Sequence, residues 1–156
     1  MPGISVWLRT SSCSRIEGTT SHGTMAPSIA RWLSASGTWG TGIPIPVTPQ
    51  FMERGGERYN INCAICHGPT GAGDGIVKQY GMATIVSIVD DRITNMSDGE
   101  IFNTITHGKN TMMSYGGTVT VNDRWAIIAY LRALQRSQRA TAADVPPEAR
   151  VELEKQ

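Results

Sequence analysis

The chain has 156 residues, which leaves room for one domain with an appended segment and excludes a two-domain enzyme. With a net charge of +1 and dispersed Lys and Arg, it offers no patch for nucleic-acid phosphates, and its three cysteines exclude a dense disulfide scaffold. Leu, Ile, Val and Phe make up about one fifth of the residues, at the edge of the disordered range, but the low net charge favours folding. We therefore expect a thin core, completed by irregular segments or by a group that is not protein.

Residues 1–47 are the first zone, which is rich in Ser, Thr, Gly and Pro and keeps no regular hydrophobic period. Its first residues lack the apolar stretch of an export signal, and no window of the chain approaches the ~18 apolar residues of a membrane span. Three tryptophans, Trp7, Trp32 and Trp39, are scattered along it. Ile and Pro alternate over residues 43–46, which predicts an extended backbone. We expect an arm that lies as a strap on another surface; a flexible tail is the alternative.

Residues 48–138 should hold the regular structure. Thr48 is a capping residue and Pro49 suits the first helical position, so the first helix should run from Pro49 to Tyr59 or Asn60.

A capping box predicts the second helix. Ser97 precedes it, Glu100 follows three residues later, and Gly108 is a plausible stop. Its apolar face is formed by Ile101, Phe102 and Ile105.

The third helix has the clearest pattern and should start at Asn122 or Asp123. Apolar residues follow at helical spacing: Ile127, Tyr130, Leu131 and Leu134. Residues 71–95 should be loop with at most one short helical turn, and residues 139–156 a polar tail with a possible short helix after Pro147. The sequence therefore predicts an all-α fold of about three to four helices, with no convincing strand.

The sequence Cys63-Ala-Ile-Cys66-His67 is typical of a c-type haem attachment site. Two thiols separated by two residues can add to the two vinyl groups of a porphyrin, and the following histidine then lies under the iron. A redox dithiol would need a βαβ setting, and a zinc site would need a second pair of ligands. We expect one covalent haem c held by Cys63 and Cys66, with His67 as an axial ligand to the iron.

The second axial position decides whether the iron transfers electrons or binds small ligands. Downstream candidates are Met82, Met96, His107, Met112 and Met113. The irregular segment 108–116, bounded by glycines, can bring a thioether over the porphyrin face opposite His67.

Residues 49–137 resemble a small class I-type cytochrome c. The residues that carry the resemblance are Gly55, Tyr59, the Cys63–Gly68 motif, Gly71–Gly75, the loop with Met112, and Trp125–Leu134. In that fold the first and last helices cross at a glycine and aromatic side chains, roles that the resemblance gives to Gly55, Tyr59, Trp125 and Tyr130. The same resemblance makes Met112 the second axial ligand, with Met113 in place of the usual proline, and places Tyr59 and Trp125 beside the haem.

A further resemblance covers most of residues 16–138. Residues 16–19, 43–48, 54–59 and 123–127 are similar to the monohaem cytochrome subunit of alternative complex III, a bacterial quinol-oxidising membrane complex. This implies electron transfer without bond chemistry of its own, in a respiratory or photosynthetic complex on the periplasmic side of the inner membrane. The implied partners are multihaem cytochrome and iron–sulfur subunits and a downstream cytochrome or oxidase. The alternatives are a free periplasmic cytochrome c, and a peroxidase or gas sensor with an open iron position.

Several other residues have simpler interpretations. The sequence Gly-Ala-Gly-Asp-Gly at residues 71–75 fits neither the dinucleotide-binding fingerprint nor the phosphate-binding P-loop, and indicates a tight turn after His67. His107 should be a surface or capping histidine, and the acidic pair at residues 90–91 should be loop charge. Cys13 is expected to be a free thiol rather than a lipid anchor.

Overall fold

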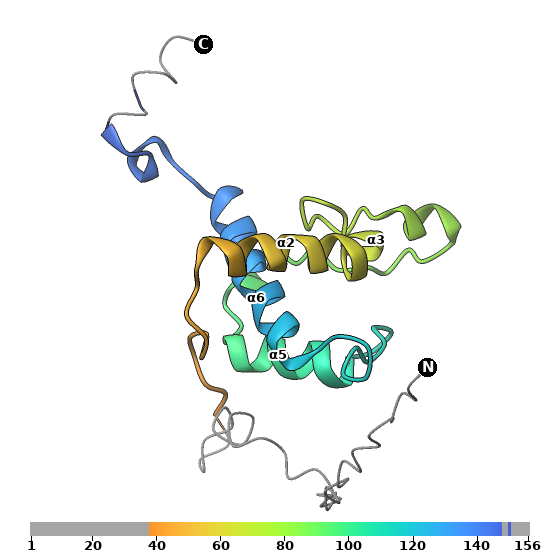
Figure 1. Cartoon of the computed structure of the whole chain (residues 1–156). Coiled ribbons are helices and arrows are strands. Elements are labelled where there is room, and N and C mark those ends of the chain that lie inside the picture. The colour runs from red at the N-terminus through yellow and green to blue at the C-terminus, as the bar shows by residue number, and fades with distance from the viewer. Residues whose placement is uncertain (1–37, 148–149, 151–156) are drawn as a thin grey trace, which may run out of the picture.

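The computed structural model describes residues 38–147 and residue 150. In this part of the chain there are five α-helices: α2 (Pro49–Asn62), α3 (Ala64–His67), α4 (Asp91–Thr94), α5 (Asp98–His107) and α6 (Val121–Ser137). Two 3₁₀ turns, η1 (Ile76–Tyr80) and η2 (Ala142–Asp144), accompany them (Figure 1). The described residues form no β-strand, and Lys109 and Met112 form an isolated bridge. The predicted all-α class is confirmed.

Local capping explains where the helices begin. The Thr48 hydroxyl accepts a hydrogen bond from the Phe51 backbone N–H at 3.1 Å, and Ser97 accepts one from Glu100 at 3.3 Å. Each bond satisfies one of the amide groups that a helix start leaves without a partner. Both predicted starts are confirmed.

Two helix boundaries differ from the sequence prediction. The first helix, α2, continues to Asn62 instead of ending at Tyr59 or Asn60, because the Cys63 N–H still donates to the Tyr59 carbonyl. The last helix, α6, begins earlier than predicted: Thr120 is its cap and accepts from the Asp123 N–H at 3.1 Å.

The segment between residues 71 and 95 contains two short helical turns, η1 and α4, where one at most was expected. Asp90 is the cap of α4, because its carboxylate accepts from the Ile93 N–H at 3.1 Å. Its interpretation as simple loop charge was therefore wrong. A cap of this kind satisfies backbone donors and helps to fix an otherwise irregular stretch.

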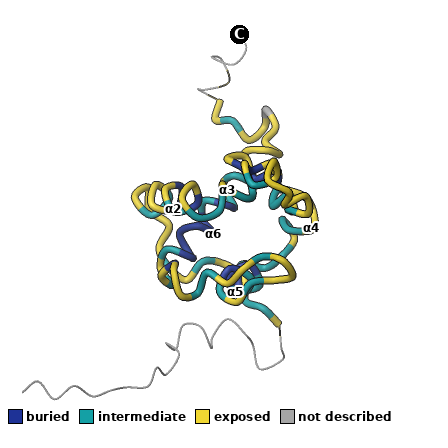
Figure 2. The backbone as a smooth tube through the Cα atoms, turned by 90° about the vertical axis from the view of Figure 1, so that its right-hand side faces the viewer, coloured by how far each residue is buried: buried dark blue, intermediate teal, exposed yellow. Residues whose placement is uncertain are grey.

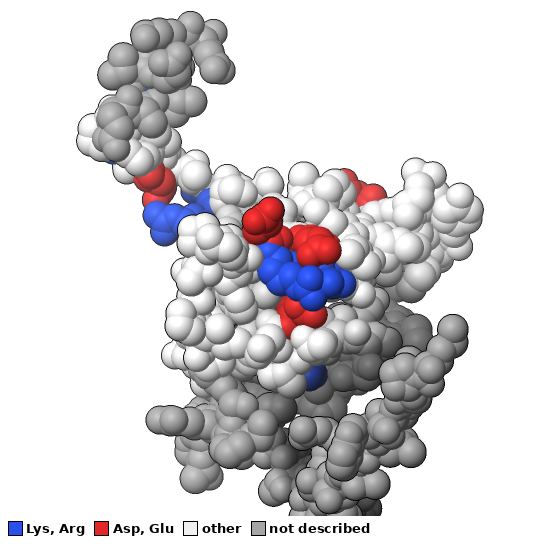
Figure 3. Space-filling view, in the orientation of Figure 1, with Lys and Arg blue, Asp and Glu red and all other residues white. Residues whose placement is uncertain are grey.

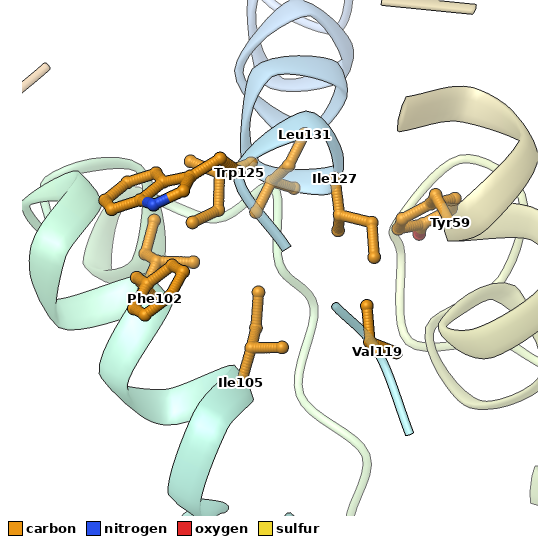
Figure 4. Packing of buried hydrophobic residues seen from close by; sticks show 9 residues of the cluster. Tyr59, Phe102, Ile105, Val119, Trp125, Ile127 and Leu131 are labelled. Carbon is orange, nitrogen blue, oxygen red and sulfur yellow. The ribbon is translucent and has the colours of Figure 1, made fainter. Parts of the chain in front are cut away.

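The hydrophobic core is built on α6, and the buried members are drawn in Figure 4. The Trp125 ring of α6 stacks on Phe102 of α5, with ring centroids 4.4 Å apart and planes 19° apart. The buried cluster consists of Tyr59, Ile101, Phe102, Ile105, Val119, Trp125, Ile127, Ile128 and Leu131. This small cluster fits the thin core that the composition predicts.

The crossing of α2 over α6 depends on a glycine. A Cβ atom at Gly55 would lie 2.1 Å from the Ala126 carbonyl oxygen and 3.0 Å from the Tyr130 Cβ. The Tyr59 and Tyr130 rings pack beside it, with centroids 5.4 Å apart. The predicted roles of Gly55, Tyr59 and Tyr130 at the crossing agree with this geometry. Trp125 does not share that role, because it faces Phe102 of α5 instead.

Replacing Gly55 by Ala is expected to lower the free energy of unfolding by about 2–3 kcal/mol. Alanine gains up to ~1 kcal/mol in helix propensity over glycine, but the new methyl group meets a backbone carbonyl that cannot move alone. The two helices must separate, which opens the core between them. Urea unfolding followed by far-UV circular dichroism measures the change.

Gly117→Ala is the control for this prediction. A Cβ at Gly117 would meet nothing within 4 Å, so we expect a change within about 0.5 kcal/mol. If Gly55→Ala were as stable as Gly117→Ala, close contact at the crossing would not be what stabilises the fold.

A bidentate ion pair joins the same two helices at the surface. Arg54 Nε lies 2.7 Å from Asp123 Oδ1, and Arg54 Nη2 lies 3.2 Å from Asp123 Oδ2. The hydrogen bond from Arg54 is the main reason why the pKa of Asp123 lies below its ordinary value. Figure 3 shows a compact group of charges over α2, whereas the surface toward α3 and η1 is mostly uncharged.

The last residues of the predicted arm lie against the helical domain. The Gly99 N–H donates to the Gly40 carbonyl at 3.0 Å, and the Gly42 N–H donates to Asp98 Oδ2 at 2.7 Å. Ile43 and Ile45 pack against the core cluster. This part of the arm is a strap on the domain itself, while residues 1–37, with Cys13, lie outside the described residues.

The C-terminal tail is described only in part. After α6, an ion pair of 2.5 Å between Arg136 and Asp144 holds η2 near the helix end. Most of the short helix expected after Pro147 lies outside the described residues. In the part of the chain that the structure describes, no helix has both the length and the hydrophobicity needed to span a membrane.

Candidate functional site

The two cysteines of the motif come from the end of α2 and the one-turn helix α3. The Cys63 carbonyl accepts hydrogen bonds from the N–H groups of Cys66 at 3.1 Å and of His67 at 2.8 Å. This turn places Cys63, Cys66 and His67 on one short, hydrogen-bonded unit. Both thiols are free.

The imidazole of His67 is held by a backbone carbonyl. Its Nδ1 lies 3.1 Å from the Val86 oxygen, so this nitrogen must carry the proton if the contact is a hydrogen bond. The other nitrogen, Nε2, is then left with a free lone pair. Burial lowers the pKa of His67, which favours the neutral ring that a metal ion requires. Metal-bound histidines commonly show this arrangement, with a second group orienting the ring.

A glycine-rich turn folds back onto the motif and closes it. The N–H groups of Gly73 and Gly75 donate to the carbonyls of His67 at 2.9 Å and Cys66 at 3.0 Å. Gly73 has a φ of +78°, and a Cβ there would lie 2.8 Å from the Ile85 oxygen and 3.0 Å from the Val86 carbonyl carbon. The absent side chain lets the segment with Val86 approach His67. The tight turn expected here is present.

Tyr59 supports the motif from the other side. Its buried hydroxyl donates to the Gly68 carbonyl at 2.7 Å, directly after His67. Burial is the main reason why the pKa of this phenol lies above its ordinary value, so the group stays a neutral donor. The hydroxyl therefore joins α2 to the chain that leaves the histidine.

The thiols do not have the properties of a redox dithiol. Burial, with a smaller contribution from Cys66, raises the pKa of Cys63 to about 12. Catalytic dithiols instead have a lowered pKa, because the thiolate is their nucleophile. Among the described residues there is also no group of three or more His, Cys, Asp or Glu side chains that could hold a metal ion. Neither the dithiol nor the zinc interpretation gains support.

The predicted axial methionine lies on a tight turn after α5. Lys109 and Met112 exchange two backbone hydrogen bonds of 3.1 and 3.0 Å, and Asn110 between them has a φ of +55°. Met112 is half-buried and packs against the core cluster, whereas the side chain of its neighbour Met113 is 78% exposed. Of the two neighbouring candidates, only Met112 lies on the inner side.

The other candidates lie elsewhere. Met82 is 45% exposed, and Met96 packs against the core cluster before α5. His107 is exposed in the last turn of α5, where its Nδ1 lies 3.2 Å from the Asn103 carbonyl. This is the capping position expected for it. Trp125 is buried against Phe102, and its predicted contact with a haem remains a prediction.

The methionine loop and the cysteine motif contact the same core cluster. Met112 and Tyr115 of the loop and Cys63 of the motif all pack against it. Burial raises the pKa of the Tyr115 phenol above its ordinary value. In Figure 2, α2 and α3 lie on one side of the domain and α5 on the opposite side, with α6 joining them. The loop is tied to α5 by hydrogen bonds from Tyr115 N–H to the Ile105 carbonyl at 3.0 Å and from Gly116 N–H to the Thr106 carbonyl at 3.1 Å.

Two polar contacts are not predicted from the sequence: the Val86 carbonyl on His67 Nδ1, and the buried amide of Gln135 on Ile88. The Val86 carbonyl is a backbone atom, and no residue type announces it. Gln135 is different, because it continues the buried face of α6 after Ile128 and Leu131, at positions i, i+3 and i+7. A polar residue on such a stripe was the available signal.

The residues present fit a c-type haem by their chemistry. Two free thiols and a neutral histidine share one turn, and the histidine presents Nε2 because Nδ1 is occupied. The thioether side chain of Met112 packs against the same core cluster as Cys63. When bound, such a haem supplies an iron that takes up and releases one electron.

Comparison with known proteins agrees with this chemistry. No curated protein sequence matches the chain. Residues 50–131 match the sequence profile described as cytochrome c oxidase, cbb3-type, subunit III, which covers α2 to most of α6. The chain therefore belongs to this family of class I cytochrome c domains, whose activity is haem-based electron transfer.

Proposed function

We propose that the chain binds one haem c through thioether bonds to Cys63 and Cys66, with His67 Nε2 and the Met112 sulfur as axial ligands. The observation that carries the proposal is the contact of His67 Nδ1 with the Val86 carbonyl beside two free thiols on the same turn. It selects Nε2 for the iron and holds the ring in one orientation. Two protein ligands then fill both axial positions, as in electron-transfer haems.

The chain's own residues bury and orient the haem. Tyr59 and the Gly73–Gly75 turn fix the backbone on both sides of His67. Backbone hydrogen bonds to α5 support the loop with Met112. A haem held here would supply the electron chemistry, while these contacts of the chain hold the His67 ring in one orientation.

We further propose that the protein works as a fixed subunit of alternative complex III, on the periplasmic side of the inner membrane, beside multihaem and iron–sulfur subunits. The resemblance in residues 16–19 and 43–48, which precede the first helix of the cytochrome domain, supports this assignment. The charge distribution supports it as well. Residues 60–89 contain only Asp74 and Lys78 as charged side chains, and residues 108–122 only Lys109. Freely diffusing partners commonly use opposite charges to steer their encounter.

Two measurements test the proposal. A pyridine haemochrome spectrum of the purified protein should show thioether-linked haem, and its absence would overturn the haem assignment. The tagged chain, isolated in mild detergent from membranes of its source organism, should bring multihaem and iron–sulfur subunits with it. Because few charges surround the site, this association should survive a wash in ~1 M salt, where the Debye length falls to about 3 Å. Release of the chain as a monomer at that salt concentration would instead support a free periplasmic carrier.

A further inference from the structure

A buried glutamine on α6 faces the segment that orients His67. Gln135 is only 2% exposed, and both polar ends of its side chain are paired. Its Oε1 accepts from Arg132 Nη1 at 2.9 Å, and its Nε2 donates to the Ile88 carbonyl at 2.7 Å. Burying an amide group costs free energy unless the group is hydrogen-bonded. The Gln135 side chain is therefore held by these two partners and does not exchange them for water.

The peptide groups of Ile88 are clamped from two sides. Its N–H donates to the Gly71 carbonyl at 2.8 Å, and its carbonyl accepts from Gln135. These contacts join residue 88 to the turn after the cysteine motif and to the last helix. Arg139 adds a weaker, exposed contact at 3.1 Å to the Val89 carbonyl. The segment around Ile88 is therefore held between the motif turn and α6.

The clamp lies two residues from the carbonyl that contacts His67. Val86 is close in sequence to Ile88, and its carbonyl group packs over Gly73 at the distances given above. The rest of the 82–87 stretch has no helix of its own to fix it. A shift at Ile88 is therefore transmitted to Val86 through only two peptide units.

We propose that Gln135 is a positioning residue for the iron ligand: by holding Ile88, it keeps the Val86 carbonyl on His67 Nδ1 and so sets the reduction potential. This inference rests on the proposed haem ligation by His67. Arg132 assists by fixing the glutamine oxygen, and it is itself paired with Asp98 at 2.7 Å. No contact between Gln135 and the haem is required.

The direction in which the reduction potential changes distinguishes a positioning residue from one that only stabilises the fold. A hydrogen bond to Nδ1–H makes the imidazole a stronger electron donor, which favours ferric iron. Loosening that bond raises the reduction potential. A variant that merely loosens the fold admits water to the haem, which favours the more charged ferric state and lowers the potential.

The test uses the haem-loaded, full-length protein with Gln135→Leu and, in case leucine disturbs packing, the unbranched Gln135→Met. Gln138→Leu is the matched control, because the same chemical change is made at an exposed position at the end of α6. The readouts are the reduction potential and the solvent-exchange rate of the His67 Nδ1 proton, followed by NMR in the reduced state. Far-UV circular dichroism checks that each variant is folded.

We expect both Gln135 variants to have a raised potential and an Nδ1 proton that exchanges roughly fivefold faster, as for the loss of one ordinary hydrogen bond. Gln138→Leu should match the parent protein. An unchanged or lowered potential in folded, haem-loaded variants would overturn the positioning role and leave the haem assignment intact. Absence of haem from the parent protein would instead overturn the proposed function itself.

Discussion

Replacing both Cys63 and Cys66 by Ser is expected to abolish covalent haem in the protein. Thioether bonds need sulfur, and a hydroxyl group at the same position does not add to a porphyrin vinyl group under the same conditions. After denaturation and acid–acetone extraction, the parent protein should keep its haem on the polypeptide, whereas the double variant should have none. Haem-stained denaturing gels and the pyridine haemochrome spectrum measure the difference.

The third cysteine of the chain provides the control. Cys13→Ser leaves the motif intact, so its covalent haem content should equal that of the parent protein. Each single variant, Cys63→Ser or Cys66→Ser, should keep one thioether at most, which shifts the haemochrome band toward that of a haem with one free vinyl group. Haem that stays on the polypeptide of the double variant would contradict the assignment of both thiols.

Replacing Met112 by Ala is expected to remove the sulfur ligand of the iron. The sulfur-to-iron charge-transfer band of the ferric protein should disappear, and the ferrous protein should bind carbon monoxide readily. The reduction potential should fall by on the order of 0.2 V, a part of the ~0.8 V range that axial ligands span, because methionine favours ferrous iron. Visible spectra and a redox titration measure these changes.

Met113→Ala is the matched control, because it removes the same side chain from the next position. Met113 points to solvent, so neither the charge-transfer band nor the potential should change. The opposite result, with an intact band in Met112→Ala and a lost band in Met113→Ala, would move the ligand to Met113. An intact band in both variants would exclude the whole loop, and absence of that band from the parent protein would favour the open iron of a peroxidase or gas sensor.

The sequence predicts helix starts well, because they depend on contacts between residues a few positions apart. Thr48 and Ser97 were identified as caps because a cap uses only the first turn of its own helix. Gly55 and Tyr59 were placed at the helix crossing through the family resemblance, and the close approach to Ala126 bears this out.

The late start predicted for α6 is an error with a local cause. Thr120 and Asp123 have the spacing of a capping box, which the prediction did not use, and the Thr120 hydroxyl accepts from the Asp123 N–H at 3.1 Å. The error at Trp125 comes from a contact that is distant in sequence, because no pattern near Trp125 shows that its ring stacks on Phe102 rather than at the crossing.

The candidate site also has one part that the sequence identifies and another part that only the folded chain brings together. The residue types and spacing of Cys63, Cys66 and His67 identify the chemistry, because the haem itself dictates that spacing. The Val86 carbonyl that orients the histidine is brought in by chain folding over Gly73. Gln135 reaches Ile88 across 47 positions, and such a pairing has no local signature.

The crossing at Gly55 has a consequence for how the chain matures. Synthesis proceeds from the N-terminus, so α6 is the last of these helices to emerge. Until then α2 lacks the partner for its glycine face, and a helix of 14 residues is marginal alone. The crossing also closes a loop of chain that spans nearly the whole domain, which costs conformational entropy. Only the contacts with α6 can offset this cost, so the crossing forms after α6 is present. The backbone around Cys63 and Cys66 therefore gains its support from α6 only at this last docking event, and until then both thiols stay open to solvent.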